Sequence, residues 1–332
     1  MKTSPQKRYT QGAVLLFVLL SISVLVSTGQ FLQTPSPDPL LLRLLVSPVA
    51  GMIVAVANVL ILLLMGNKYR ILQEGASRQY LFLSALFLLS APWATDFAGS
   101  LLALTPLLLA FYALLGAFKQ QNAPAPLMTA GFLWGVSALI HPPFTWSVPL
   151  IFIFSVSLRA FSLRNLVAAL LGFAIPFLLV LPGSHLFFPQ WEVPRNFYLR
   201  LIYFHAGGFG LEPFPAPATV WGLFVSLLFV AILLSGLFHQ QIRHLTSRLY
   251  STLLFGLVLL LLILSLFSGK RIGTESAFVL PVLALLATEE LWEARPKVRK
   301  YIVISSVVVV LLLALFTRIA GFLPGLGSAP MG

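Results

Sequence analysis

Residues 44–65 read LLVSPVAGMIVAVANVLILLLM, and this stretch contains no charged side chain. As a helix rising about 1.5 Å per residue, it is long enough to cross a hydrocarbon core of about 30 Å. Backbone groups in lipid must be hydrogen-bonded within their own segment, so the stretch predicts a transmembrane α-helix. The fold class follows from how often this pattern recurs along the chain.

Similar apolar runs fill most of the sequence. Long runs cover residues 12–28, 100–118, 220–238, 252–267 and 301–317. Shorter or proline-broken runs cover residues 80–93, 127–140, 144–158, 166–181 and 277–288. Hydrophobic residues make up 59% of the chain and charged residues only 9%, which is more apolar surface than one soluble core could bury. The sequence therefore predicts an all-α, polytopic transmembrane helical bundle of about 11 helices.

Basic residues predict the orientation of this bundle. Most of the 21 lysines and arginines fall on one face when the segments between runs are assigned alternately to two sides, starting with a basic N-terminus. The positive-inside rule makes that face cytoplasmic, so the N-terminus is predicted to be cytoplasmic and the C-terminus to be outer. The net charge of +12 then reflects topology and anionic lipid, and it gives no reason to expect nucleic acid as a partner.

The chain is predicted to form one integral membrane domain over residues 1–332. Residues 1–182 would hold the first seven helices, residues 183–217 a long outer loop, and residues 218–332 the last four helices. The first run follows a basic segment but shows no small-residue cleavage site, so we interpret it as an uncleaved helix. The absence of cysteine excludes disulfides and thiolate chemistry.

Carboxylates divide between the two predicted faces. The cytoplasmic group is Glu74, Glu289, Glu290 and Glu293, which we expect to be solvated charges flanking helix ends. The outer group is Asp38, Asp96, Glu192, Glu212 and Glu275. Chemistry on the outer face would therefore depend on the second group.

Asp38 and Asp96 are the candidate catalytic residues. They lie in the first and second predicted outer loops, where two carboxylates could converge at the membrane surface. There they could hold a divalent cation such as Mg²⁺ or Mn²⁺, or one could act as a general base. Both positions also suit an ordinary turn or helix N-cap aspartate, and the sequence leaves that alternative open.

Basic residues on the outer face are candidates for binding phosphate. Arg195 and Arg200 lie in the long outer loop, whose middle resembles an interfacial helix, and guanidinium groups pair well with phosphate oxygens. The same residues also suit an aromatic belt at the membrane surface. Lys270 and Arg271, followed by Glu275, form a second basic cluster that could equally be paired ions at a helix entry. His141, His205 and Glu275 are candidate accessory residues, although a histidine such as His141 more often caps a helix at the interface.

Three segments carry a diffuse resemblance to a known family. They are Ala130 to Pro143, which reads AGFLWGVSALIHPP, the turn from Arg159 to Arg164 with LGFAIP at 171–176, and SAFVLPVLALL at 276–286. These segments resemble helices of GT-C-type glycosyltransferases. The resemblance implies a bacterial inner-membrane enzyme that takes a sugar from a polyprenyl-phosphate donor on the outer face. It further implies that Asp38 and Asp96 match the family's acidic residues and that the outer basic residues bind donor phosphate.

The layout is also similar to a poorly characterised family of Bacteroidota inner-membrane proteins. The first outer loop, residues 33–42, is shorter than is usual in GT-C enzymes, and the chain carries no outer soluble domain. The competing interpretation is a non-catalytic scaffold or assembly subunit of a cell-envelope complex, with membrane lipids and envelope proteins as partners. A transporter is less favoured because nearly every charge maps to a loop or helix end.

Overall fold

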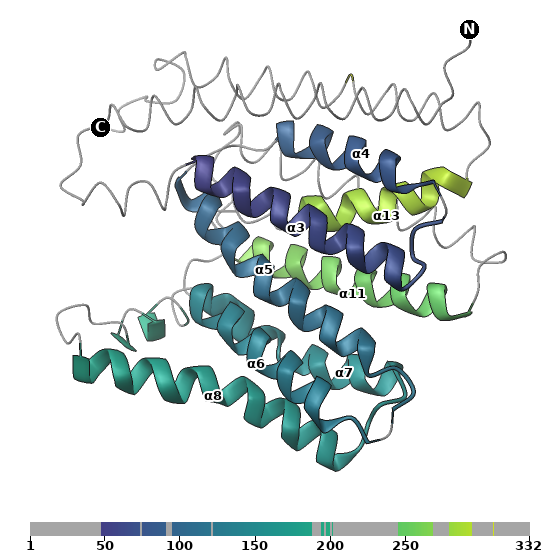
Figure 1. Cartoon of the computed structure of the whole chain (residues 1–332). Coiled ribbons are helices and arrows are strands. Elements are labelled where there is room, and N and C mark those ends of the chain that lie inside the picture. The colour runs from purple at the N-terminus through teal and green to yellow at the C-terminus, as the bar shows by residue number, and fades with distance from the viewer. Residues whose placement is uncertain are drawn as a thin grey trace, which may run out of the picture. The chain divides into compact units, whose positions relative to one another are not determined.

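A computed structural model describes residues 48–73, 75–90, 95–120, 122–187, 194–195, 197–199, 201, 245–267, 279–293 and 308 of the chain. Helices are the regular elements of these residues, among which no β-strand occurs (Figure 1). The prediction of an all-α protein is therefore confirmed for this part of the chain.

The helices coincide with the predicted apolar runs. They are α3 (Pro48–Lys68), α4 (Ser77–Ser90), α5 (Thr95–Gly116), α6 (Pro124–Ile140), the 3₁₀-helix η1 (Pro142–Ser147), α7 (Pro149–Ser157), α8 (Leu163–Phe187), α11 (Leu245–Phe267) and α13 (Leu280–Glu293). The run at 144–158 forms two elements, η1 and α7, because Pro149 occupies the first position of a new helix. Runs predicted at 12–28, 220–238 and 301–317 lie outside the described residues.

The chain divides into two compact units. Unit 1 comprises Met1–Ala98, Leu211–Leu262 and Lys270–Gly332, and unit 2 comprises Gly99–Gly210 and Ile263–Gly269. The described part of unit 1 contains α3, α4, α13 and most of α11, whereas unit 2 contains most of α5 together with α6, η1, α7 and α8.

Small residues and buried polar groups hold unit 1 together. Helix α13 packs on α3 and α4, and a Cβ atom built on Gly66 of α3 would lie 3.2 Å from Leu285 of α13 (Figure 1). The buried hydroxyl of Tyr80 on α4 donates a hydrogen bond of 3.2 Å to the Val59 carbonyl of α3. These two contacts join α3 to α13 and to α4.

Arg70 ends helix α3 in the left-handed backbone region, with φ 52°. Its N–H donates to the Asn67 carbonyl at 3.3 Å, and the Ile71 N–H donates to the Gly66 carbonyl at 2.9 Å. These two bonds form a Schellman motif, which satisfies carbonyls that a helix end otherwise leaves without donors. The positive charge of Arg70 also interacts favourably with the negative C-terminal end of the helix dipole.

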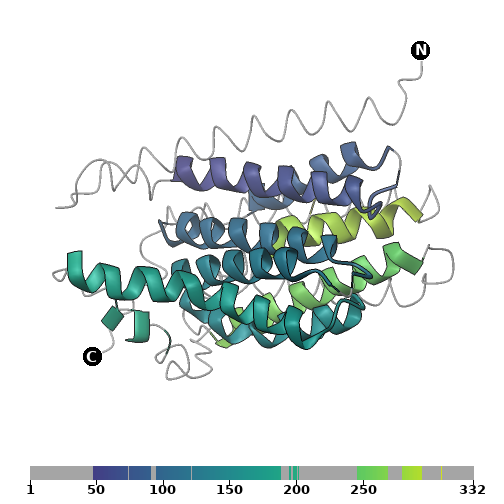
Figure 2. The same ribbon diagram turned by 60° about the horizontal axis from the view of Figure 1, so that its bottom comes forward.

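Unit 2 is built on a close contact between α6 and α8, which lie along one another (Figure 2). A Cβ atom on Gly131 would lie 2.0 Å from the Ala169 carbonyl oxygen, and one on Gly135 would lie 2.5 Å from the Phe173 carbonyl oxygen. A Cβ atom on Gly172 would lie 2.2 Å from the Met128 carbonyl oxygen. Contacting positions rise together along both helices, so α6 and α8 run parallel. Helix backbones approach this closely only where side chains are absent.

The other helices of unit 2 are joined to α6 by buried polar groups. The Ser137 hydroxyl donates to the Ala103 carbonyl of α5 at 2.6 Å, and the Trp134 indole N–H donates to the Ser147 hydroxyl of η1 at 2.6 Å. Phe154 of α7 packs edge-on against Phe111 of α5, with ring centroids 5.6 Å apart. These contacts hold η1, which connects α6 to α7, against the other helices of unit 2.

Ser147→Ala is expected to destabilise unit 2, because it removes the acceptor of a fully buried indole N–H. Leaving such a donor without a partner costs about 1–3 kcal/mol. The measurement is the midpoint of SDS-induced unfolding in mixed micelles. Ser157→Ala is the control, because its exposed hydroxyl bonds only a carbonyl of its own helix. An equal shift in both variants would contradict the prediction.

Among the described residues, two helices are long and apolar enough to cross a membrane. They cover Val49–Lys68 and Leu163–Leu186, with mean hydropathy 2.5 and 2.4. The second belongs to α8, which is mostly exposed: Leu178, Leu179 and Leu186 are 69%, 67% and 76% exposed, respectively. Helix α8 is therefore not the buried core helix of a soluble domain. It also runs to Phe187, into the segment that the sequence assigned to the long outer loop.

Candidate functional site

Several predicted site residues lie outside the described residues, namely Asp38, Arg200, His205, Lys270, Arg271 and Glu275. Their roles stay predictions. The structure describes the positions of Asp96, His141 and Arg195.

Asp96 is the second residue of α5, so it stands in the first turn of a helix of 22 residues. The free N–H groups and the dipole at this end favour a negative charge. This position lies inside the helix, beyond the place of an N-cap, which precedes the first helical residue. The catalytic role of Asp96 stays a prediction.

His141 caps the C-terminal end of α6 in an extended conformation, with φ −128° and ψ 92°. Its N–H donates to the Ser137 carbonyl at 2.9 Å, and its ring packs edge-on against Phe144 with centroids 4.8 Å apart. The ring is half-buried. The two prolines that follow His141 begin η1, so this residue marks the point where the chain turns.

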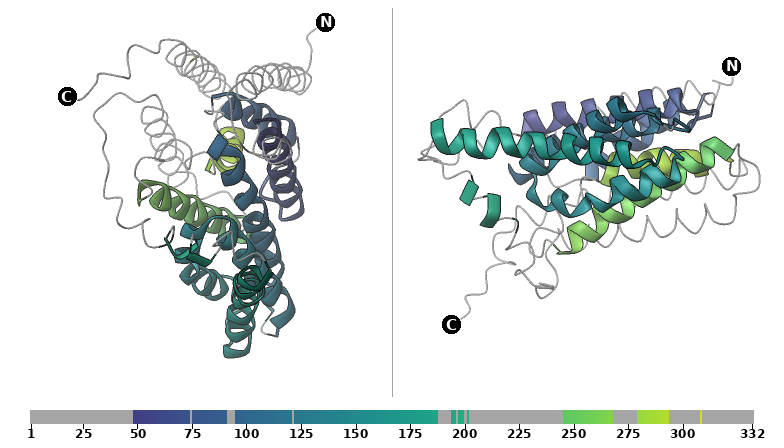
Figure 3. Two further views of the ribbon diagram at one scale, coloured as in Figure 1. Left: turned by 90° about the vertical axis from the view of Figure 1, so that its left-hand side faces the viewer. Right: turned by 90° about the horizontal axis from the view of Figure 1, so that it is seen from below.

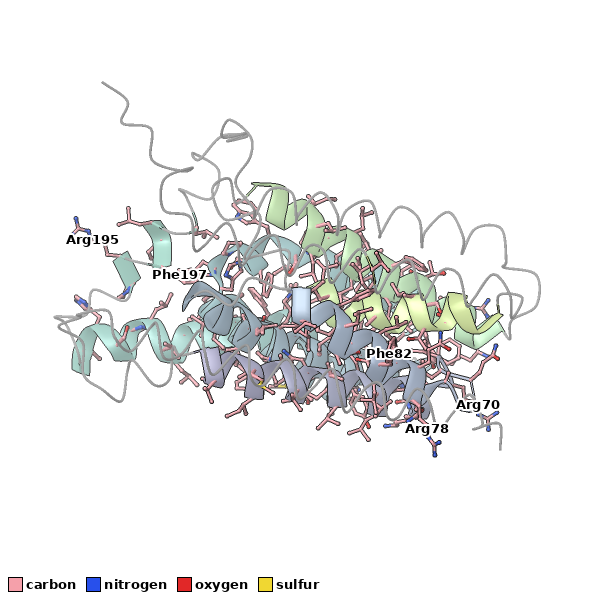
Figure 4. All side chains as sticks on the ribbon, turned by 90° about the horizontal axis from the view of Figure 1, so that it is seen from above. Arg70, Arg78, Phe82, Arg195 and Phe197 are labelled. Carbon is pink, nitrogen blue, oxygen red and sulfur yellow. The ribbon has the colours of Figure 1, made fainter. Side chains whose placement is uncertain are left out.

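Short helical turns at residues 194–195 and 197–199 follow α8 in the chain (Figure 3). Arg195 lies in the first of them. Phe197 holds the second against the helix, because its buried ring lies 5.5 Å from the ring of Phe177. The side chain of Arg195 is exposed and points away from the ribbon (Figure 4). Tyr198, also exposed, packs on Phe197 with centroids 5.9 Å apart. A short helix with one buried aromatic anchor and exposed Arg and Tyr side chains has the composition of an interfacial segment.

The parallel pair α6 and α8 orders the two ends of unit 2. His141 follows the C-terminal end of α6, and Arg195 follows the C-terminal end of α8, so both lie toward the same end. Arg164 lies in the first turn of α8 and is therefore at the opposite end. Residues that the charge pattern assigned to different faces thus lie at different ends of this unit.

Glu289 departs from its predicted environment. It is only 3% exposed, and the buried Ser251 hydroxyl on α11 lies 2.7 Å and 2.8 Å from its two carboxylate oxygens. The expectation that Glu289 is a solvated charge is therefore wrong. Helix α13 continues past its apolar run, and Ser251 of α11 contacts Glu289 there, so a position near a helix end did not imply contact with water. The preceding apolar run gave no signal of this burial.

Further polar side chains are buried in unit 1. Gln79 of α4 is fully buried, and neither its side-chain oxygen nor its nitrogen makes a hydrogen bond. Thr288 of α13 is also buried, and its hydroxyl donates to the Ala284 carbonyl at 2.7 Å. Across the described ranges, no group of three or more His, Asp and Glu side chains is arranged to hold a metal ion.

Comparison with known proteins found no matching family model, no similar curated protein and no similar solved structure.

Proposed function

We propose that this protein is a multi-pass integral membrane protein of about 11 helices with a cytoplasmic N-terminus, and that its membrane is the bacterial inner membrane. The observation that carries the proposal is the exposed apolar surface of α8. Its 25 residues contact the rest of unit 2 through a narrow strip that includes Gly172, while Leu171, Leu178 and Leu179 remain exposed. Lipid is the solvent in which such a helix is stable.

We further propose a GT-C-like glycosyltransferase activity, in which a sugar is transferred from a polyprenyl-phosphate donor on the outer face. Asp38 is the leading general-base candidate, and Asp96 is the second carboxylate. Support comes from the GT-C-like segments, two of which form the closely packed α6 and α8, and from the common end of unit 2 toward which His141 and Arg195 lie. Arg195, Arg200, Lys270 and Arg271 would bind the donor phosphate.

A scaffold or assembly subunit of a cell-envelope complex is the second candidate. The exposed Tyr198 beside Arg195 favours it, because tyrosine and arginine are enriched at protein interfaces. A scaffold needs no convergence of Asp38 and Asp96, whereas a transferase requires both near the donor phosphate.

The test is transfer of radiolabelled sugar from a panel of polyprenyl-phosphate donors by the purified protein in lipid. Asp38→Asn and Asp96→Asn are each expected to reduce the transfer rate by at least about 100-fold, because general-base catalysis contributes about that much. Glu293→Gln is the matched control and is expected to retain the wild-type rate. Absence of transfer with every donor, together with copurification of a stable envelope partner, would favour the scaffold.

A further inference from the structure

Three cations gather at the end of unit 2 opposite His141. Lys119 follows α5, Arg159 follows α7, and Arg164 lies in the first turn of α8. We call these three residues the basic end of unit 2. All three side chains are exposed.

Two hydrogen bonds join the loops that carry the basic end, one between backbone groups and one donated by a side chain. The Lys119 N–H donates to the Leu158 carbonyl at 3.0 Å, which joins the loop after α5 to the loop after α7. The Asn165 side chain donates to the Ala160 carbonyl at 2.7 Å, which ties the start of α8 to the residue next to Arg159. The cations therefore sit on a rigid frame rather than on independent chain ends.

Lys119 and Arg159 both adopt left-handed backbone conformations, with φ 59° and 55°. Glycine or asparagine occupies such positions at lower cost, because a left-handed conformation is unfavourable for residues with larger side chains. The helix dipole offsets part of that cost for a basic residue at a helix C-terminus. It does not account for Arg164, which stands in the first turn of α8, where the dipole disfavours a cation.

The stretch of chain that carries these cations lacks acidic residues. Residues 99–187 contain no aspartate and no glutamate. None of the three side chains forms an ion pair in the structure, and the Lys119 ammonium lies 5.2 Å from the ring centroid of its neighbour Phe118. Within the described residues, the basic end of unit 2 therefore presents positive charge without a paired carboxylate.

Apolar side chains border the basic end. Phe161, between Arg159 and Arg164, is 45% exposed and packs edge-on against Phe152 with ring centroids 5.3 Å apart. Leu163 begins α8 and is 74% exposed, and the exposed apolar face of α8 continues from it. Cations next to an exposed apolar helix face match the two parts of a phospholipid, its headgroup and its acyl chains.

From this arrangement we infer that the basic end of unit 2 binds the phosphate headgroup of an anionic bilayer phospholipid, whose acyl chains lie along Phe161 and α8. A free anion would use the cations alone and would leave the apolar border without a role. The inference depends on the proposed membrane location but not on the transferase activity. Because Lys119, Arg159 and Arg164 lie at the opposite end from His141, such a lipid would be separate from any donor substrate near His141.

Native mass spectrometry can test the inference on the full-length protein in detergent mixed with phosphatidylglycerol or phosphatidylcholine. The wild type is expected to retain phosphatidylglycerol in preference to phosphatidylcholine, and raising the salt concentration should weaken that preference. Removing three charges with Lys119→Asn, Arg159→Asn and Arg164→Gln together should reduce the preference by up to about 100-fold, since each basic residue near an anionic surface contributes about fivefold. Asparagine is chosen because it tolerates the left-handed conformation.

The matched control keeps the charges, with Lys119→Arg, Arg159→Lys and Arg164→Lys together, and it should retain the preference for phosphatidylglycerol. Equal retention of both lipids by the wild type would overturn the inference without reference to any variant. Displacement of the lipid by soluble glycerol phosphate at equal concentration would also overturn it, because the site would then bind a free anion. Retention of sugar transfer in the three-charge variant would show that the lipid site and the transferase site are distinct.

Discussion

Gly131→Ala is expected to lower the free energy of unfolding by at least about 3 kcal/mol, which is the upper end of ordinary overpacking. The new methyl group would lie 2.0 Å from the Ala169 carbonyl oxygen and 3.0 Å from the Phe173 nitrogen. Both are backbone atoms of α8, so no side-chain rotation can relieve the clash, and the two helices must separate. The measurement is the midpoint of SDS-induced unfolding in mixed micelles, read from the loss of helical circular dichroism.

Gly183→Ala is the matched control for that substitution. Gly183 lies in α8, and a Cβ atom built there meets no atom within 4 Å. Alanine at a helical position without a clash is expected to be neutral or to stabilise by up to about 1 kcal/mol. Gly172→Ala should instead behave like Gly131→Ala, because its Cβ atom would lie 2.2 Å from the Met128 carbonyl oxygen. Equal midpoints for Gly131→Ala and Gly183→Ala would show that α6 and α8 do not pack through these glycines.

Glu289→Ala is expected to lower the free energy of unfolding by about 2–4 kcal/mol. The substitution truncates a side chain that is 3% exposed and removes the carboxylate oxygens that accept the hydrogen bond from the buried Ser251 hydroxyl. It therefore combines a cavity with the loss of a buried hydrogen bond between α11 and α13. Ser251→Ala should cost less, about 0.5–1.5 kcal/mol, which is the net contribution of a typical hydrogen bond.

A double-mutant cycle distinguishes this interaction from general damage to unit 1. Glu289→Ala and Ser251→Ala contact one another, so their effects on the unfolding midpoint should be less than additive. Gln120→Ala, which truncates an exposed polar side chain, should leave the midpoint within about 0.5 kcal/mol of wild type. Strict additivity of Glu289→Ala and Ser251→Ala would contradict the hydrogen bond between α11 and α13.

The positions of the helices were largely predictable from the sequence, because apolar length is a direct signal of a helix that lipid can solvate. The run at 44–65 corresponds to α3, and the run at 100–118 corresponds to α5. Helix ends were less predictable. The position just past the end of α3 and of α7 is left-handed, and glycine is the usual residue there. In this chain Arg70 and Arg159 occupy those positions, so the sequence lacks the usual signal of a helix end.

The burial of individual side chains and the packing partners of the helices were harder to predict than the location of the helices along the chain. Glu289 shares its helix end with Glu290 and Glu293, and a charge pattern cannot tell which of three nearby acids a neighbouring helix will cover. The parallel contact of α6 with α8 was also not predicted, although GT-C-like segments included both glycine-bearing stretches. Periodicity reports which residues share a helix face, but it does not identify the helix against which that face packs.

In the proposed membrane location, the unequal lengths of the elements in unit 2 would have a consequence for the surrounding bilayer. Helix α8 has 25 residues and spans about 37 Å, whereas the return path through η1 and α7, with 6 and 9 residues, spans about 26 Å at most. A hydrocarbon layer of about 30 Å cannot match both at once. If unit 2 lies in a bilayer as proposed, lipids beside α7 would have to shorten or the leaflets to dimple, while α8 would accommodate its excess length by tilting. Unit 2 would thus make the membrane thinner on one side of itself than on the other.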